Sequence, residues 1–136
     1  FIDFLNQHGV EPVLKELYQN LFTKEYLREH PESLEALMER GRQFKAEGII
    51  RAAEAMMKRP NRLELWSKLE LPCLVLAGKQ DPLIPESRSI EQAAKGNEVM
   101  IEIINDMGHM GPIEQPETVA EILDSFLVQS LNLIKN

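Results

Sequence analysis

Asp81 and His109 are the two residues whose types and spacing best fit a chemical role in this 136-residue sequence. Asp81 follows an apolar run that ends at Gly78, and His109 follows a second apolar run and stands between Gly108 and Met110. A carboxylate can accept a hydrogen bond from an imidazole N–H, fix the tautomer of the ring and stabilise its imidazolium form. The pair therefore predicts acid–base chemistry, provided that the fold brings the two side chains together.

The stretch 71–116 predicts the elements that would position them. Residues 73–77 are continuously apolar, which is typical of a strand covered on both faces in a parallel sheet. A helical pattern over 86–94 follows, and then a second strand over 98–104. Neighbouring parallel strands lie about 5 Å apart, and open α/β sheets bind ligands at the carboxyl ends of their strands. We therefore expect the acid and the histidine to meet at this edge.

Both residues also have ordinary explanations. Asp-Pro is common in turns, so Asp81 could be a turn residue, and His109 could be a histidine of a surface loop. Asp106 and Glu114 flank His109 and are alternative acids, although Glu114 stands just before a predicted helix, where a negative charge is favourable in itself. Gly108 and Gly111 are expected to let the loop turn sharply. Neither explanation is excluded for a single residue; the strength of the prediction lies in the pair.

Other chemistry has weaker support. His8 and His30 lack the spacing of metal ligands and are expected at the surface. Cys73 falls inside an apolar run, which favours a small core residue. It is the single cysteine of the chain, which fits a reducing compartment, with the cytoplasm as the default. Ser33 stands where a helix cap is expected, and Ser87 and Ser89 belong to the predicted helix over 86–94. None of the three stands between glycines at a strand-to-helix turn. No Gly-x-Ser-x-Gly, Walker loop or Gly-x-Gly-x-x-Gly occurs in the sequence.

The residues before the first strand have helical periodicity. We expect four or five short amphipathic helices there, with a break at 23–31 and the following approximate segments: 10–21, 32–44, 47–60 and 62–69. This half is either a helical subdomain that packs on itself or a lid whose Met56 and Met57 cover a substrate pocket; methionine fits both. A last amphipathic helix begins near Pro116, with a frayed tail over 132–136.

Composition sets the class of protein. The chain has 43% hydrophobic and 27% charged residues and a net charge of -7. The hydrophobic content is normal for a soluble globular protein, and the acidic balance argues against binding of nucleic acid, because a nucleic-acid surface needs clustered lysine and arginine. No apolar run approaches the ~20 residues of a membrane span, and no signal peptide is expected. The sequence begins without methionine, which we interpret as a start that is not the natural one.

The segments PCLVLAGKQDPLIP and NDMGHMGPIEQPETVAEILDSFL resemble the C-terminal part of the α/β-hydrolase superfamily. In that family an acid follows a late strand, and a Gly-His-Met loop precedes Glu-x-Pro and a last helix. The segment AMMKRPNRLELWSKLELP resembles the end of the family's lid. The resemblance implies a helical lid over 1–69 and a C-terminal strand–helix–strand–helix part of the core over 70–136. It also implies that Asp81 is the triad acid and His109 the base, in the family's chain order.

The resemblance further implies what this sequence does not contain. The nucleophile (Ser, Asp or Cys), its elbow and the oxyanion hole would precede the lid, so we expect hydrolysis of an ester, lactone or related acyl or C–C bond only in an intact protein. The chain alone is predicted to be inactive and to pair, along an open strand edge, with the missing N-terminal half or with another copy. We expect a small, largely apolar substrate and no metal or organic cofactor.

Two other classes of function remain open from the sequence. The first is a non-catalytic relative that uses the pocket as a ligand receptor, and the second is a stand-alone helical binding module. A serine elbow upstream of Phe1 would favour the enzyme, and its loss would favour the receptor. Cooperative unfolding of the isolated chain would favour the binding module.

Overall fold

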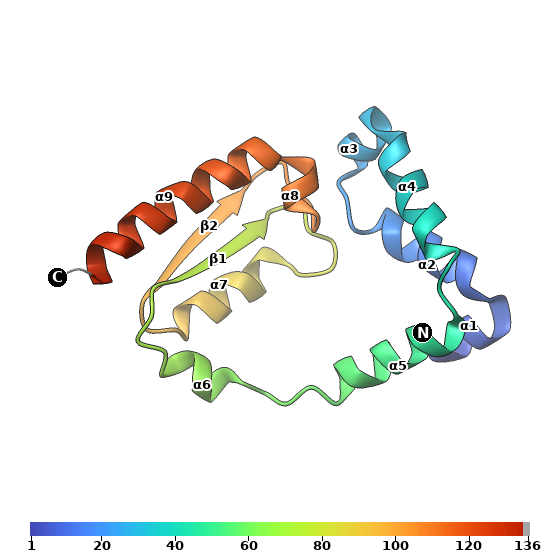
Figure 1. Cartoon of the computed structure of the whole chain (residues 1–136), viewed down its shortest axis with the longest axis horizontal. Coiled ribbons are helices and arrows are strands. Elements are labelled where there is room, and N and C mark those ends of the chain that lie inside the picture. The colour runs from blue at the N-terminus through green and yellow to red at the C-terminus, as the bar shows by residue number, and fades with distance from the viewer. Residues whose placement is uncertain (135–136) are drawn as a thin grey trace. The chain divides into compact units, whose positions relative to one another are not determined.

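The computed structural model describes residues 1–134, and the chain divides into two compact units, Phe1–Asn61 and Arg62–Asn136. The first unit is entirely helical (Figure 1). Its helices are α1 (Ile2–His8), α2 (Val10–Gln19), α3 (Lys24–Glu29), α4 (Pro31–Gly41) and α5 (Ala46–Met57). The predicted division at 69/70 between lid and core stays a prediction, since a functional lid and a compact unit need not share a boundary.

The first unit packs around the contact between α2 and α4. Its buried hydrophobic side chains are Leu5, Val13, Leu14, Phe22 and Met38. Gly41 ends α4, and a Cβ atom there would lie 2.6 Å from Cδ1 of Leu14. A larger residue at this position would therefore require the side chain of Leu14 to move. The helical half therefore has buried side chains of its own, which is compatible with a self-packed subdomain and with a lid.

The expected break at 23–31 is wrong, because α3 occupies most of it. The hydroxyl of Thr23 accepts a hydrogen bond from the backbone N–H of Tyr26 at 3.1 Å and so caps the helix. The ring of Tyr26 also stacks on Phe22 and contacts His30, with ring centroids 5.3 and 4.6 Å apart. With α1 and α3 present, residues 1–69 contain more helices than the four or five expected. Phe44 lies beyond the end of α4 and is 53% exposed, so it does not belong to the apolar face predicted for that helix.

The second unit is the predicted strand–helix–strand–helix arrangement. In chain order it contains α6 (Leu63–Ser67), β1 (Cys73–Gly78), α7 (Glu86–Ala94), β2 (Val99–Ile104), α8 (Gly111–Glu114) and α9 (Pro116–Ile134). The two strands pair in parallel, from Cys73 opposite Val99 to Gly78 opposite Ile104. The indole N–H of Trp66 in α6 donates a hydrogen bond to the carbonyl oxygen of Gln92 in α7 at 2.8 Å.

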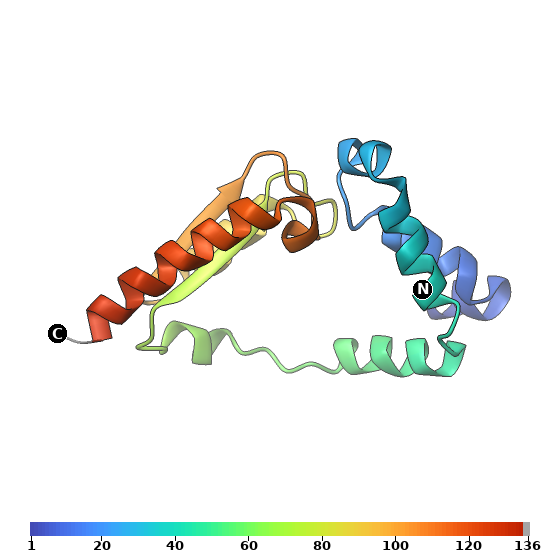
Figure 2. The same cartoon turned by 45° about the horizontal axis from the view of Figure 1, so that its top comes forward.

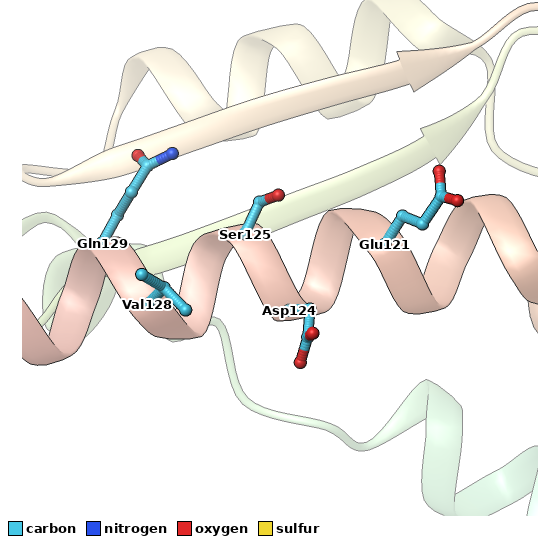
Figure 3. A pocket seen from close by; sticks show the side chains of 5 residues that line it. All are labelled: Glu121, Asp124, Ser125, Val128 and Gln129. Carbon is cyan, nitrogen blue, oxygen red and sulfur yellow. The ribbon is translucent and has the colours of Figure 1, made fainter.

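Helices lie on either side of the two strands. The helix α9 runs along them in both views of the chain (Figures 1 and 2), and in the close view it passes in front of them while another helix lies behind (Figure 3). The strands are only partly covered: Ala77 and Gly78 are buried, whereas Cys73 is half-buried. The expectation of Cys73 as a core residue is therefore only partly met.

The far edge of β1 has no neighbouring strand in the described part of the chain. At the two ends of the pairing, the N–H groups of Cys73 and Lys79 donate to carbonyl oxygens of Glu98 and Ile104. Donors to one neighbour recur at every second residue of a strand, so residues 73, 75, 77 and 79 face β2. The N–H groups of residues 74 and 76 consequently face the open edge.

The last helix is longer than expected. The frayed tail was predicted from Asn132, but α9 continues to Ile134, in keeping with the absence of proline and glycine after Pro116. The remainder of the predicted tail, residues 135–136, lies outside the described residues. No helix among the described residues is long and apolar enough to cross a membrane.

Candidate active site

The structure brings Asp81 and His109 into direct contact. Asp81 lies in the loop after β1, and His109 lies in the loop between β2 and α8. Nδ1 of His109 is 2.8 Å from Oδ2 of Asp81. The contact follows from the parallel register, because Gly78 and Ile104 end the two strands side by side. The meeting of the two side chains, expected from the sequence, is thus observed.

The two loops are also joined by their backbones. The N–H of Gln80 donates to the carbonyl oxygen of Met107 at 3.0 Å. A Cβ atom on Gly78 would clash with that same oxygen and with the carbonyl oxygen of Gly108. Only glycine therefore allows the end of β1 to approach the loop that carries His109 so closely.

The sequence predicts that the conformational freedom of the glycines beside His109 permits a sharp turn, but the loop does not use that freedom. Among the described residues the glycine with a positive φ is Gly9, at 80°, so neither Gly108 nor Gly111 uses a conformation reserved for glycine. Gly111 leaves room for a side chain instead. A Cβ atom on it would meet the sulfur of Met107, so a larger residue here would require that buried side chain to move.

The Asp81 carboxylate has a different partner for each oxygen. Oδ2 contacts His109, while Oδ1 accepts hydrogen bonds from the backbone N–H groups of Leu83 and Ile84 at 2.8 and 3.0 Å. Partial burial raises the pKa of Asp81, but the hydrogen bonds from Ile84, His109 and Leu83 outweigh that effect and leave the pKa below its usual value. Asp81 is therefore ionised at neutral pH.

The ionised state of Asp81 fixes the tautomer of the neutral histidine. A carboxylate can only accept hydrogen bonds, so the proton must be on Nδ1 of His109, which donates it to Asp81. The lone pair of the neutral ring is then on Nε2. The imidazole side chain is 38% exposed whereas that of Asp81 is 10% exposed, so the ring is accessible and its acid partner is covered. This arrangement suits a base held and oriented by a buried carboxylate.

The alternative acids have other partners. Asp106 accepts a hydrogen bond from the side-chain amide of Gln80 at 3.3 Å. Glu114 accepts hydrogen bonds from the backbone N–H groups of Gly108 and Met110. Asp81 is therefore the carboxylate whose hydrogen bond orients the ring of His109.

The pair lines a small hollow of about 190 Å³. Its walls include the end of β1, the loop before α7 and the loop of His109. Its volume is below the roughly 300 Å³ at which ligand pockets begin, so the hollow fits part of a site better than a whole one. Ser89 also lines it and is buried, but no hydrogen bond joins Ser89 to His109 in the described part of the chain.

A larger hollow, of about 580 Å³, lies elsewhere, along one face of α9 (Figure 3). Its lining consists of Glu121, Asp124, Ser125, Val128 and Gln129. All five residues belong to one helix, and neither Asp81 nor His109 is among them. Within the described residues, no group of three or more histidine, cysteine, aspartate or glutamate side chains is placed to hold a metal ion.

Comparison with known proteins identifies the fold. No family model matches the chain. Over 129 residues it is 24% identical to 3-oxoadipate enol-lactonase 2 of Acinetobacter baylyi, a match that covers 90% of this chain and 45% of the relative. Among solved structures it is similar to a thermophilic esterase from Thermogutta terrifontis, with a TM-score of 0.83 and 28% identity over 95% of this chain and 47% of the esterase.

The enol-lactonase from Burkholderia xenovorans gives the same TM-score of 0.83 at 18% identity, covering 93% of this chain and 48% of that structure. This is the C-terminal portion of an α/β-hydrolase fold. The chain spans about half the length of the relatives that it matches. The resemblance and the fold class predicted from the sequence are therefore confirmed.

Proposed function

We propose that Asp81 and His109 are the acid and the base of a hydrolytic triad whose nucleophile belongs to polypeptide outside these 136 residues. The observation that carries the proposal is the hydrogen bond of 2.8 Å between Nδ1 and Oδ2, which leaves Nε2 as the basic atom. In this scheme Nε2 takes the proton of the nucleophile as an acyl-enzyme forms and then donates it to the leaving group. Asp81 holds the ring throughout and stabilises its charged form.

The class of reaction is the hydrolysis of an ester, a lactone or a related acyl or C–C bond. The names of the relatives, which are an esterase and two enol-lactonases, support this class. We propose a small and largely apolar substrate and a reaction that needs no metal or organic cofactor. The chain alone lacks a nucleophile and an oxyanion hole in this scheme, so its own hydrolytic activity should be absent.

The partner of the chain, in this proposal, is the N-terminal half of a hydrolase core. Its last strand would pair with the open edge of β1, where residues 74 and 76 present their N–H groups. An exposed apolar stripe supports the same partner: Leu123, Leu127 and Leu131 of α9 are 44%, 54% and 54% exposed. Surfaces of this kind are covered in stable proteins. The half could be joined upstream in the same polypeptide or supplied as a separate one.

A chimera tests the catalytic roles. The N-terminal half of the Thermogutta terrifontis esterase, joined to residues 1–136, supplies the missing part, and p-nitrophenyl butyrate serves as the substrate. We expect His109→Ala to lower kcat/KM by roughly 10³-fold or more, the usual effect of removing a triad member. The matched control is His30→Ala, which removes a histidine of the helical unit that is 49% exposed and should leave turnover unchanged. Equal turnover by the chimera with and without His109 would contradict the proposal.

A further inference from the structure

We propose that Glu114 is a positioning residue that holds the backbone of His109 in the orientation needed to reach Asp81. This inference rests on the proposed role of His109 as a base. Glu114 is the last residue of α8, and one of its carboxylate oxygens, Oε1, accepts two hydrogen bonds. The donors are the backbone N–H of Gly108 at 3.1 Å and that of Met110 at 3.2 Å. One atom thus accepts from the backbone N–H groups of the residues on both sides of His109.

The neighbouring residue adds a second attachment to the same loop. The side-chain amide of Gln115 donates to the carbonyl oxygen of Asp106 at 2.8 Å, and its own oxygen accepts a hydrogen bond from Thr118 in α9. The consecutive residues Glu114 and Gln115 therefore connect the loop of His109 to α8 and α9. The Glu-Gln-Pro segment of the sequence has a physical role in this arrangement, beyond the favourable charge near the start of a helix.

Backbone attachment matters because His109 lies in a loop. Residues 107–110 form neither a helix nor a strand, so ladder hydrogen bonds do not fix their direction. The imidazole reaches Asp81 only if the Cα–Cβ bond of His109 keeps its direction. A carboxylate suits the task, since its charge strengthens each bond and one oxygen accepts from two donors.

The test uses the 136-residue chain and needs no enzymatic activity. Amide hydrogen exchange is measured by NMR at Gly108 and Met110, together with the downfield signal of the Nδ1 proton of His109. For Glu114→Ala we expect at least tenfold faster exchange at both amides and loss of the Nδ1 signal. The amides of Val75 and Ala77 in β1 should keep their exchange rates, which shows that the unit remains folded.

Further variants distinguish the effect of the length of the Glu114 side chain from the effects of its charge and of general stability. Glu114→Gln keeps an oxygen of the same reach and should retain the Nδ1 signal, with exchange within about threefold of the parent. Glu114→Asp keeps the charge but is shorter, so it should behave like Glu114→Ala, and it replaces that variant if alanine prevents folding. Glu117→Ala removes an exposed carboxylate from the first turn of α9 and should change neither readout.

The proposal is overturned if Glu114→Ala and Glu114→Asp leave the two amides and the Nδ1 signal unchanged. It is equally overturned if Glu117→Ala produces the same losses, because the effect would then be one of helix charge. Failure of the proposed function is distinguishable from either result. If His109→Ala leaves the chimera active while the exchange results are as expected, Glu114 still positions the loop, and only the catalytic role of His109 is lost.

Discussion

At the scale of single residues, Asp81 shows that a structural role and a chemical one can share a side chain. The sequence left open whether this residue serves a turn or a histidine, and the structure shows it doing both. Oδ1 closes the turn through Leu83 and Ile84, and Oδ2 accepts from His109. The turn hydrogen bonds hold the carboxylate still, so the histidine meets an acid that is already in place.

The hydrogen bonds of Asp81 predict a pH-dependent contribution to stability. The pKa of Asp81 is lowered in the folded chain relative to about 3.9 in an unfolded one, so ionisation favours the folded state. The contribution is complete above about pH 4 and is lost as the pH falls through the lower, folded pKa. We expect Asp81→Asn to reduce the free energy of unfolding by roughly 1–2 kcal/mol at pH 7, with a smaller difference from the parent below pH 4.

Urea denaturation followed by the fluorescence of Trp66, the single tryptophan, measures this difference at several pH values. Asp124→Asn changes an exposed carboxylate on α9 in the same unit and is the control. A loss of stability from Asp81→Asn that stayed constant from pH 7 to below pH 3 would show that the charge of Asp81 has no part in it.

At the scale of elements, the sequence predicted what depends on local pattern and missed what depends on contacts. The two strands, α7 and the start of α9 follow from apolar periodicity and from the proline and glycine that bound them, and the structure has them near their expected limits. The helix α3 was missed because it depends on a cap from Thr23 and on ring contacts of Tyr26. The four-residue helix α8 is too short to show a helical period.

The candidate site, too, could be predicted only in part from the sequence. The pairing of Asp81 with His109 could be predicted, because parallel strands bring their carboxyl ends together whatever the remaining sequence. The hydrogen bonds that Glu114 accepts could not be predicted, since an acid before a helix has an equally good explanation in the charge preference of helix starts. The signal that could have pointed to it is the Glu-Gln pair directly after the short segment Gly111–Ile113, where two side chains of similar reach face one loop.

Gly78 provides a prediction at this scale. Its missing side chain lets β1 approach the loop of His109, so Gly78→Ala must push two backbone segments apart. We expect a loss of about 1–3 kcal/mol in the free energy of unfolding, as for an overpacked core, from urea denaturation followed by Trp66 fluorescence. Gly48→Ala makes the same chemical change inside α5, where a Cβ atom would meet nothing within 4 Å. This control should not lower the transition of Trp66, and a loss from Gly48→Ala as large as that from Gly78→Ala would contradict the steric explanation.

At the scale of the whole molecule, the apolar surface of α9 is wider than two strands can cover. Val119 is buried, and Ile122 and Phe126 are half-buried on the same side of the helix. The stripe formed by Leu123, Leu127 and Leu131 lies next to that side and remains exposed. An open strand edge and an uncovered apolar stripe in one unit are the two observations that support the proposed partner.

The open edge of β1 predicts an alternating pattern of amide exchange. In the isolated chain at low concentration, the amides of Leu74 and Leu76 should exchange at least tenfold faster than those of Val75 and Ala77, which donate to β2. In the chimera with the esterase half, all four amides should be protected, because a new strand then accepts from the outer pair.

The dependence of amide protection on protein concentration tests whether a second copy of the chain occupies the edge of β1 instead. If the isolated chain associates through β1, protection of Leu74 and Leu76 should rise with protein concentration in parallel with the mass measured by light scattering. Replacing Leu127 and Leu131 together by glutamine should weaken that association, because it removes the apolar stripe without touching the strand. A monomeric chain in which the amides of Leu74 and Leu76 are as protected as their neighbours would show that the edge is already satisfied, and the proposed partner would have no strand to pair with.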